Sequence, residues 1–338
     1  MARFDIVVAG SGAAGAVAAF AAARLGRRVA IVGEPALHQP GEGLADGAAA
    51  VLSRLGLGDL LNEAHHVRCH GIACVTAAGR VVRPWPGFIL DRPKFTADLM
   101  AAAIAAGCEQ VCGEISAVAA DQAGNGVTLC IKTQTDFKTI STATVIDATG
   151  RRAAVARRIG AARRVFTNLA AAWATFRANE IAAAPGTLAI EAAGAHWWYV
   201  AVGRHAAAAA VLGRRPLGDS ASWLADARRT ALLADVAPAT PVRPVIRPAN
   251  VSVLEPVCGE GWLACGDAAA TFDPLSGYGL GFAIGTGYAA ARAADAQLHG
   301  DRLARLAFSQ LVSDRVARAW AGLAEAYQGL AMGRLDAA

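Results

Sequence analysis

Two glycine-rich segments roughly 250 residues apart carry the residue types that bind nucleotide cofactors. In the first, an apolar run at residues 4–8 is followed by the spacing GxGxxG. The first glycine allows a tight turn, the second lets the backbone approach a pyrophosphate, and the third lets the next helix pack closely on the strand. The N-terminus of that helix then faces the phosphates. The motif predicts dinucleotide binding by Gly10, Ser11, Gly12, Ala13, Ala14 and Gly15.

The elements around this motif are those needed to position it. Residues 4–8 are typical of a buried strand, residues 13–25 favour a helix that ends before Gly26, and residues 28–32 favour a second strand. Glu34 follows that strand, 19 residues after Gly15, where a carboxylate can accept hydrogen bonds from ribose hydroxyls. GxGxxG alone is weak evidence, because an Ala/Gly-rich packing helix can contain it. The strand, helix and acid together favour the nucleotide site.

The second segment predicts which dinucleotide is bound. Residues 262–265 form an apolar run that we expect to be the last core strand, and Gly266 and Asp267 follow it directly. A carboxylate there can bind the polyol chain of FAD. The next loop leads into a helix whose N–H groups can stabilise the negative charge of a reduced isoalloxazine ring. Its candidate flavin-binding residues are Pro274, Ser276, Gly277, Gly279 and Leu280. Alone this segment favours a helix N-cap by Asp267 and a glycine-rich turn, but paired with the first it predicts FAD.

Composition limits the classes of protein to consider. The 338 residues suffice for one large domain or two interleaved ones. The net charge of +5 is mild and no basic run is present, so we expect no nucleic-acid partner. The seven cysteines lack metal-ligand spacing, which predicts reduced thiols in the cytoplasm and no metal site. Residues 6–23 carry no charge, but three glycines and the preceding Asp5 argue against a membrane span.

The order of predicted elements suggests a discontinuous α/β architecture. We expect helices at 45–55, 92–106, 220–234 and from about 282 onward, a hairpin at 71–83, and a β-meander at 111–119, 127–133 and 138–142 before a separate buried strand at 143–148. A second sheet is expected from strands at 170–177, 187–191, 197–202 and 206–212, although the alanines at 206–210 also suit a helix. The prediction is a Rossmann-like FAD-binding fold with an inserted antiparallel-sheet substrate domain and C-terminal helices. The predicted divisions are 1–70, 92–165 and 255–300 for FAD, 71–91 and 166–254 for substrate, and 301–338 for the C-terminal helical segment.

Five segments, in order, resemble the FAD-dependent monooxygenases of the para-hydroxybenzoate hydroxylase fold. The resemblance is to the branch with flavin-dependent halogenases, geranylgeranyl reductases and the peptide hydroxylases that mature quinone cofactors. The segments are the GxGxxG motif with Glu34, Pro40-Gly41-Glu42-Gly43-Leu44 before the helix that ends at Leu55-Gly56-Leu57, Leu90-Asp91-Arg92-x-x-Phe95, Asp147-Ala148-Thr149-Gly150-Arg151, and Gly266 through Gly279. They span most of the chain, whereas residues 160–250 match only loosely.

The resemblance implies roles for individual residues. Glu34 would bind the adenosine ribose, and Asp267 the ribityl or pyrophosphate region. Arg92 would approach the FAD from the helix that it opens; the alternative is a surface residue at a helix start. Ser276, Gly277 and Gly279 would border the isoalloxazine ring. Residues 41–44, including Gly41 and Gly43, would pass close to the flavin.

Two departures argue against halogenation. Halogenases of this branch carry an active-site lysine before the Asp-Arg-x-x-Phe helix, and this chain has no lysine before Lys94. They also carry Trp-x-Trp-x-Ile-Pro. The nearest segment here, Trp197-Trp198-Tyr199-Val200-Ala201-Val202, keeps only the first tryptophan.

The chain has no second strand–GxGxxG–helix unit, so we expect NAD(P)H to dock transiently or a separate flavin reductase to supply electrons. With reduced flavin and O2, a C4a-hydroperoxide would perform the hard step in a dry pocket. The candidate catalytic residues are Glu42, which could steer a proton, and His196 and Trp198, which share one side of a strand. The alternatives are a helix-preceding cap for Glu42 and an aromatic core strand for the other two. His65-His66 is either a general base or a solvated loop.

These observations predict an FAD-dependent monooxygenase of biosynthesis. Its substrate would be a small aromatic or amino-acid-derived molecule, or a peptide that bears such a group. The alternatives are a geranylgeranyl-reductase-like alkene reductase, a flavin-dependent halogenase and a non-catalytic FAD-binding protein.

Overall fold

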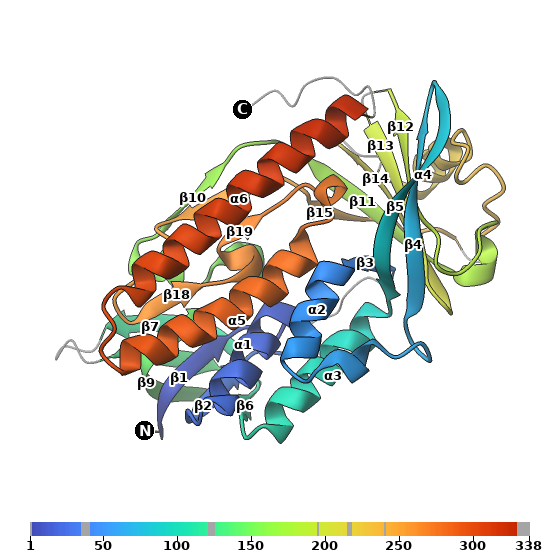
Figure 1. Cartoon of the computed structure of the whole chain (residues 1–338). Helices are drawn as coiled ribbons and strands as arrows, with labels where there is room; N and C mark the ends of the chain where they lie inside the picture. The colour runs from blue at the N-terminus through green and yellow to red at the C-terminus, as the bar shows by residue number, and fades with distance from the viewer. Residues whose placement is uncertain are drawn as a thin grey trace.

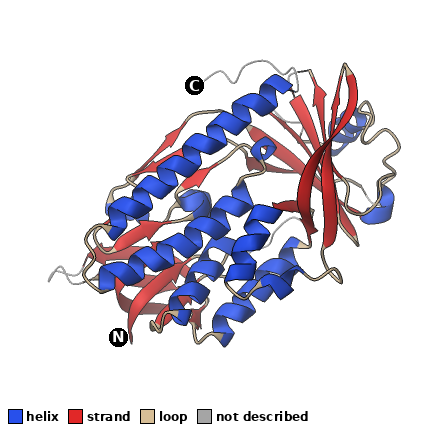
Figure 2. Ribbon diagram, in the orientation of Figure 1, coloured by secondary structure: helices blue, strands red, loops and turns tan. Residues whose placement is uncertain are grey.

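The computed structural model describes residues 2–34, 41–120, 126–194, 196–214, 218–239 and 241–329 (Figure 1). Figure 2 shows strands gathered at two ends of the molecule, with helices between and alongside them. The long helix α6 (Ala304–Gly329) runs along one side from the first sheet toward the second. Among the described residues, no helix combines the length and apolarity needed to cross a membrane.

The first sheet contains the nucleotide-binding strands. Its order is β17 (Cys258–Gly259), β18 (Trp262–Ala264), β9 (Phe137–Asp147), β1 (Ala2–Ala9), β2 (Val29–Val32) and β6 (Glu109–Val111). From β18 to β6 every neighbouring pair is parallel. The apolar run at the start of the chain forms β1, which pairs with β2 on one side and β9 on the other. A parallel strand in this position is buried on both faces, which accounts for its apolar sequence.

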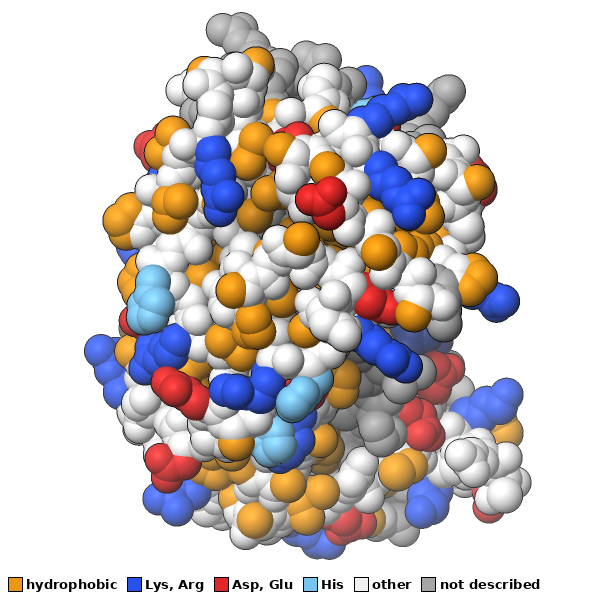
Figure 3. Space-filling view, turned by 90° about the vertical axis from the view of Figure 1, so that its right-hand side faces the viewer, with side chains coloured by type: hydrophobic (Ala, Val, Ile, Leu, Met, Phe, Trp, Pro, Cys, Tyr) orange, Lys and Arg blue, Asp and Glu red, His pale blue; other side chains and the backbone are white. Residues whose placement is uncertain are grey.

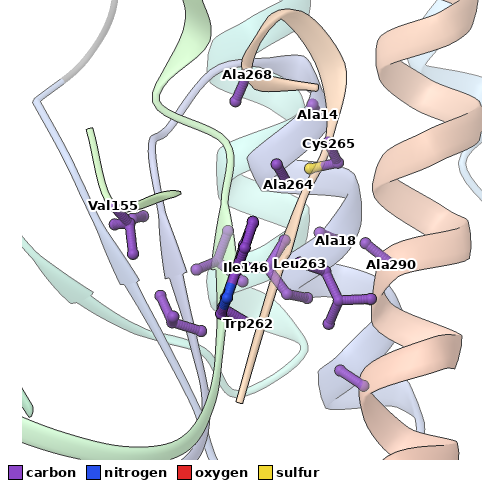
Figure 4. Packing of buried hydrophobic residues seen from close by; sticks show 14 of the residues in the cluster. Ala14, Ala18, Ile146, Val155, Trp262, Leu263, Ala264, Cys265, Ala268 and Ala290 are labelled. Carbon is purple, nitrogen blue, oxygen red and sulfur yellow. The ribbon is translucent and has the colours of Figure 1, made fainter. Parts of the chain in front are cut away.

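Helices with small residues cover this sheet. Helix α1 (Ala13–Arg24) packs against α5 (Gly279–Leu298), and α3 (Arg92–Ala105) lies beside α1. A Cβ at Gly287 of α5 would lie 2.3 Å from the carbonyl oxygen of Ala14, so glycine permits the close approach. In Figure 4, Ala18 of α1, Leu263 of β18 and Ala290 of α5 lie in the same core.

The last strand of the predicted meander and the predicted buried strand after it form one continuous strand, β9. Strands β7 (Glu114–Ala120) and β8 (Val127–Lys132) pair with each other, and β8 pairs with β9. The first half of β9 pairs with the hairpin while its second half enters the core between β1 and β18. The predicted break at residue 143 is therefore wrong. Polar threonines and serine on the exposed half of β9 resembled a separate strand.

The second sheet has the order β15, β11, β14, β13, β12, β4, β5, β3. The bounds are β15 (Val245–Pro248), β11 (Ala170–Arg177), β14 (Ala206–Gly213), β13 (His196–Val202), β12 (Leu188–Ala193), β4 (Val67–Thr76), β5 (Gly79–Leu90) and β3 (Glu42–Ala45). Its pairs are antiparallel except for β12 with β4, which is parallel. The inserted sheet is thus mixed at the junction between its two chain segments. The division into domains stays a prediction.

The structure confirms one local prediction in this region over its alternative and shortens a predicted helix. The alanines at 206–210 form strand β14, because β11 and β13 pair with both of its edges and tertiary pairing outweighs helix propensity. The helix expected at 220–234 is α4 (Ser220–Ala227), which follows the capping residue Asp219 and is followed by turns.

Figure 3, which views the right-hand side of Figure 1, shows basic side chains dispersed among apolar and acidic ones.

The remaining elements are a small third sheet, helix α2 and several short 3-10 segments. A small sheet has the order β10 (Ala162–Val165), β16 (Ser252–Glu255) and β19 (Ala270–Thr271). Helix α2 (Asp46–Arg54) confirms the predicted element at 45–55 to within a residue. The short 3-10 segments are η1 (Gly58–Leu61), η2 (Gly150–Arg152), η3 (Ala156–Ile159), η4 (Ala178–Glu180), η5 (Gly266–Ala268) and η6 (Pro274–Ser276).

Candidate flavin site

Three parallel strands end at the same edge of the first sheet. Ala9 of β1 is in register with Asp147 of β9, and Asp147 is in register with Ala264 of β18. The GxGxxG turn follows β1, and Gly266-Asp267 follows β18. Ligands of open parallel sheets bind outside the carboxyl ends of their strands. The two glycine-rich segments therefore meet where a nucleotide cofactor is expected.

The three glycines of the first motif have different surroundings. Gly10 has φ +115°, and a Cβ there would lie 2.1 Å from the Ala148 carbonyl oxygen. A Cβ at Gly15 would lie 1.8 Å from the Gly10 carbonyl oxygen. Gly12, the N-cap of α1, has no described atom within 4 Å of its Cβ position. Gly10 and Gly15 shape the turn, whereas Gly12 leaves open space above the helix N-terminus.

The start of α1 also contacts the second motif. A Cβ at Gly266 would lie 2.7 Å from the Cβ of Ala14. The Gly266 N–H donates to the hydroxyl of the buried Thr286, at 2.9 Å. Glycine at 266, with φ +56°, thus brings the turn carrying Asp267 against the start of α1.

Glu34 lies at the other side of the first motif. It is exposed just beyond β2, and its backbone carbonyl accepts a hydrogen bond from the Ser11 hydroxyl. This bond ties the end of β2 to the glycine turn and leaves the Glu34 carboxylate available to solvent. Pro40, which belongs to the next predicted segment, lies outside the described residues.

Arg92 occupies a buried position rather than the helix surface. Its side chain is 7% exposed, and its Nε lies 2.7 Å from Oε2 of Glu42, whose side chain is 44% exposed. Asp91 caps the helix by accepting from the Lys94 N–H at 3.1 Å, which places Arg92 at the first helical position. Among the described residues, Nη1 of Arg92 has no hydrogen-bond partner. A buried donor without a partner is costly, so it favours an anionic or polar ligand nearby.

Asp267 lies among charges from several segments. Burial raises the pKa of its carboxyl group; Arg151 opposes this shift, Glu42 reinforces it, and Arg163 and Arg92 also oppose it. The Arg151 Nε lies 3.7 Å from Asp267 Oδ2. The Asp267 side chain is 44% exposed, so its carboxylate remains accessible from solvent.

Asp147 of the Asp-Ala-Thr-Gly-Arg segment supports this arrangement from below. One carboxylate oxygen accepts from the Thr149 N–H and hydroxyl at 2.9 and 2.6 Å. The other accepts from the N–H groups of Val155 and Ala156 at 2.9 and 2.8 Å. The buried carboxylate is therefore used in holding the turn that presents Arg151.

The loop predicted to border the isoalloxazine ring is a short capped turn. Asp273 caps η6 by accepting from the Leu275 N–H at 2.9 Å, and Gly277 ends the turn with φ +62°. Helix α5 then begins at Gly279 without a side-chain cap. No described atom lies within 4 Å of a Cβ position at Gly279, so the helix N-terminus faces open space.

Trp85 is a site residue that the sequence reasoning missed. Its ring carbon Cη2 lies 2.8 Å from a Cβ position at Gly43, and its Nε1 lies 3.9 Å from one at Gly277. The indole therefore touches both segments predicted to border the flavin. The available signal was a tryptophan between Pro84 and Pro86 in a chain with 6% aromatic residues.

Tyr199 is a second missed residue. Its hydroxyl donates to the Gly41 carbonyl oxygen at 3.1 Å, and burial raises the pKa of the phenol. The bond joins β13 to the segment 41–44. Tyr199 occupies the place of the second tryptophan in the altered Trp-x-Trp pattern, which was the signal for it.

His196 and Trp198 lie on the other face of the same sheet. Trp198 packs against Trp223 with ring centroids 4.9 Å apart, in the core beneath α4. His196 lies beside Gly213, where its Cδ2 is 2.3 Å from a Cβ position. The structure therefore places Trp198 on the opposite face of the sheet from Trp197 and Tyr199. The catalytic roles of His196 and Trp198 stay predictions.

His66 has a structural role at the start of α3. Its side chain is fully buried, its Nδ1 accepts from the Asp91 N–H at 3.2 Å, and its ring packs on Phe95. Burial lowers the pKa of His66, which favours the neutral ring. The histidine thus supports the start of α3, while His65 is exposed.

Comparison with known proteins agrees with this geometry. No protein-family model matches the chain. The menaquinone reductase of Mycobacterium tuberculosis is 30% identical over 349 aligned positions, covering 93% of this chain and 81% of the relative. The peptidyl tryptophan dihydroxylase QhpG, essential for tryptophylquinone cofactor biogenesis, has a TM-score of 0.79 at 24% identity, covering 99% of this chain and 77% of that one. A geranylgeranyl bacteriochlorophyll reductase-like protein of Thermoplasma acidophilum has a TM-score of 0.80 at 20% identity, covering 99% and 89%.

The fold is that of flavin-dependent oxidoreductases. The chain belongs to the family of the mycobacterial menaquinone reductase. Flavin-dependent halogenases share the fold as well, so the predicted fold is confirmed.

Proposed function

We propose that the protein is an FAD-dependent reductase of an apolar quinone or prenyl substrate. The observation that carries this proposal is the apolar face of the second sheet that contacts the isoalloxazine loop. Its members include Cys69, Ile72, Trp85, Trp173, Leu188, Trp197 and Tyr199, and Leu169 and Leu275 of adjoining loops pack against them. The relative at 30% identity is named for a quinone substrate of this chemistry.

The residues at the sheet edge fit FAD. In the proposed arrangement the N–H groups of Ser11 to Gly15 and the open space at Gly12 receive the pyrophosphate, and Glu34 binds the adenosine ribose. Asp267 and Arg92 hold the ribityl and phosphate region. Gly41, Gly43 and the segment from Pro274 to Leu280, which includes Ser276, Gly277 and Gly279, border the ring. The domain that binds FAD is then built from the first sheet, and the second sheet supplies the substrate face.

The protein groups around the ring bind and orient the substrate. Bound FAD supplies hydride transfer. The indole of Trp85 and the Tyr199 face exclude water from the reacting atoms, and a dry site strengthens each polar interaction within it. The substrate must also receive a proton. We assign to Glu42 the relay of that proton from solvent, because its side chain is 44% exposed while Arg92 holds Oε2.

Hydroxylation of an aromatic substrate is the second candidate. Trp173 packs edge-on against Tyr199, with centroids 5.4 Å apart, so the same face offers aromatic surfaces to a planar substrate. O2 would then be a co-substrate. In either reaction NAD(P)H or a separate flavin reductase is the proposed source of electrons.

A single-turnover experiment separates the two reactions. FAD-loaded protein is reduced with dithionite without O2 and mixed with a short-chain menaquinone, and absorbance near about 450 nm reports reoxidation of the flavin. We expect anaerobic reoxidation and a product that has gained two hydrogens. Reduced flavin that is stable to the quinone but reacts with O2 would overturn the reductase proposal. Product carrying ¹⁸O from ¹⁸O2 would then establish hydroxylation of the aromatic substrate tested.

The Glu42→Gln variant tests the proton assignment. We expect FAD to bind and the single turnover to slow by about 100-fold, the size typical of general acid–base catalysis. Asp46→Asn is the matched control, because it removes an exposed carboxylate of α2 that pairs with Arg68 of β4. Equal rates for Glu42→Gln and the wild type would remove Glu42 from the mechanism.

A further inference from the structure

The C-terminal helix reaches the isoalloxazine loop through one buried hydrogen bond. The hydroxyl of Tyr327, on the last turns of α6, donates to Oδ2 of Asp273 at 2.7 Å. Asp273 is fully buried and Tyr327 nearly so. The two residues are 54 positions apart in the chain, so this bond is a specific tertiary contact.

Asp273 uses its remaining acceptors to shape the loop. Its Oδ1 accepts from the Leu275 N–H at 2.9 Å, and its carbonyl oxygen accepts from the N–H and hydroxyl of Ser276 at 3.0 and 2.8 Å. One carboxylate oxygen therefore stabilises the turn, and the other connects the turn to α6. Any shift of Asp273 would move Ser276 and Gly277, which border the proposed ring site.

Apolar packing places the phenol at this position. Leu323 and Tyr327 of α6 form a buried cluster with Val251, and Leu275 of the loop packs against it. Trp320, one helical turn before Leu323, packs edge-on against Phe166 with centroids 5.7 Å apart. Trp197 of the substrate face also lies close to the Tyr327 hydroxyl. The contact thus joins α6, the flavin loop and the second sheet.

The electrostatics of this pair are simple. Burial raises the pKa of Asp273 to about 6, whereas the hydrogen bonds from Tyr327 and Leu275 lower it. Within the described part of the chain, Tyr327 is the one titratable group that affects this carboxyl group. Burial also raises the pKa of the Tyr327 phenol, so the hydroxyl remains a donor at neutral pH.

We propose that Tyr327 is a positioning residue of the flavin site, which holds the loop 273–277 against the isoalloxazine ring through the Asp273 carboxylate. The proposal rests on the FAD site and not on the choice of substrate. An ionised Asp273 accepts from both the loop and the helix. Protonation places a hydrogen on one of these oxygens and weakens the double contact, so the flavin environment changes with pH.

The test is FAD binding by Tyr327→Phe, measured by titration and by the visible absorption and circular dichroism of the bound flavin. The ring and its packing stay while the donor is lost. We expect the Kd for FAD to rise by roughly tenfold, as for a lost hydrogen bond to a charged group. The midpoint of the pH-dependent flavin spectrum should also move to higher pH, because the Tyr327 bond lowers the pKa of Asp273.

Two further variants make the result decisive. Tyr288→Phe removes a phenol on α5 that is bonded to Arg292, and should leave the Kd and the spectral midpoint unchanged. Asp273→Asn should abolish the midpoint near pH 6, and this readout holds even if Tyr327→Phe fails to fold. A wild-type Kd and midpoint in Tyr327→Phe, or a retained midpoint in Asp273→Asn, would overturn the proposal. Failure of the wild-type protein to bind FAD would instead contradict the cofactor assignment.

Discussion

The pyrophosphate end of the proposed FAD site is formed by backbone groups, whereas the ring end is formed by side chains. At the pyrophosphate end, Gly10, Gly12 and Gly15 offer backbone N–H groups and a close packing of strand, turn and helix. At the ring end, Trp85, Tyr199 and the Asp273–Tyr327 pair act through side chains on separate elements. A site made of backbone depends on glycine spacing in one segment, whereas a site made of side chains depends on how distant segments dock.

The largest expected effect breaks the backbone end. Gly10→Val forces a branched side chain into a turn with φ +115°, where its Cβ would meet the Ala148 carbonyl oxygen at 2.1 Å. We expect a loss of roughly 3–5 kcal/mol in the free energy of unfolding, because strain and overlap with backbone act together. Chemical denaturation of the protein without FAD measures it. A variant as stable as the wild type would contradict the described turn.

Gly12→Val at the same end should separate binding from folding. The Cβ position is open, so the stability of the protein without FAD should change little. FAD affinity should fall by about 100-fold or more, because the side chain occupies the pyrophosphate space and obstructs the helix N-terminus. Fluorescence titration measures the Kd. Unchanged binding would refute the assignment of this space to the pyrophosphate.

Trp85→Ala tests the ring end. Loss of an indole that touches both flavin-bordering segments should raise the KM for an apolar substrate by about tenfold, the effect of removing a substantial apolar contact. Trp198→Phe is the matched change on the opposite face of the sheet. It should lower the Tm and leave KM unchanged. The reverse pattern would show that the substrate lies on the α4 side.

The smallest effect is a pH dependence of stability at the ring end. Asp273 has a folded-state pKa of about 6, above the ordinary value of 3.8, so the folded chain binds this proton more tightly than the unfolded chain. Its contribution to stability therefore grows as the pH falls through 6, by about 1 kcal/mol between pH 7 and pH 5. Denaturation curves of the wild type and Asp273→Asn measure it. The difference between their pH profiles should carry this change, and parallel profiles would contradict it.

The contrast between the two ends explains how far sequence reasoning reached. The first strand, α1 and α3 were predicted because their sequence patterns are local. Strand β9 was predicted as two separate strands, and a helix was left open as the alternative for the alanine-rich β14. Pairing with distant strands decides the conformation of both segments. The face on which Trp198 lies could not be predicted because alternation fixes which residues share a side, and docking of α4 decides which side is covered.

The parallel pairing of β4 with β12 has a consequence for synthesis of the chain. Residues 67–90 form a hairpin whose β4 edge is completed only by residues 188–193. Until that later segment leaves the ribosome, β4 presents unpaired backbone groups and apolar side chains, which is a template for aggregation. The second sheet is therefore a part of the nascent protein that needs protection by chaperones, and fragments ending before β12 should be insoluble.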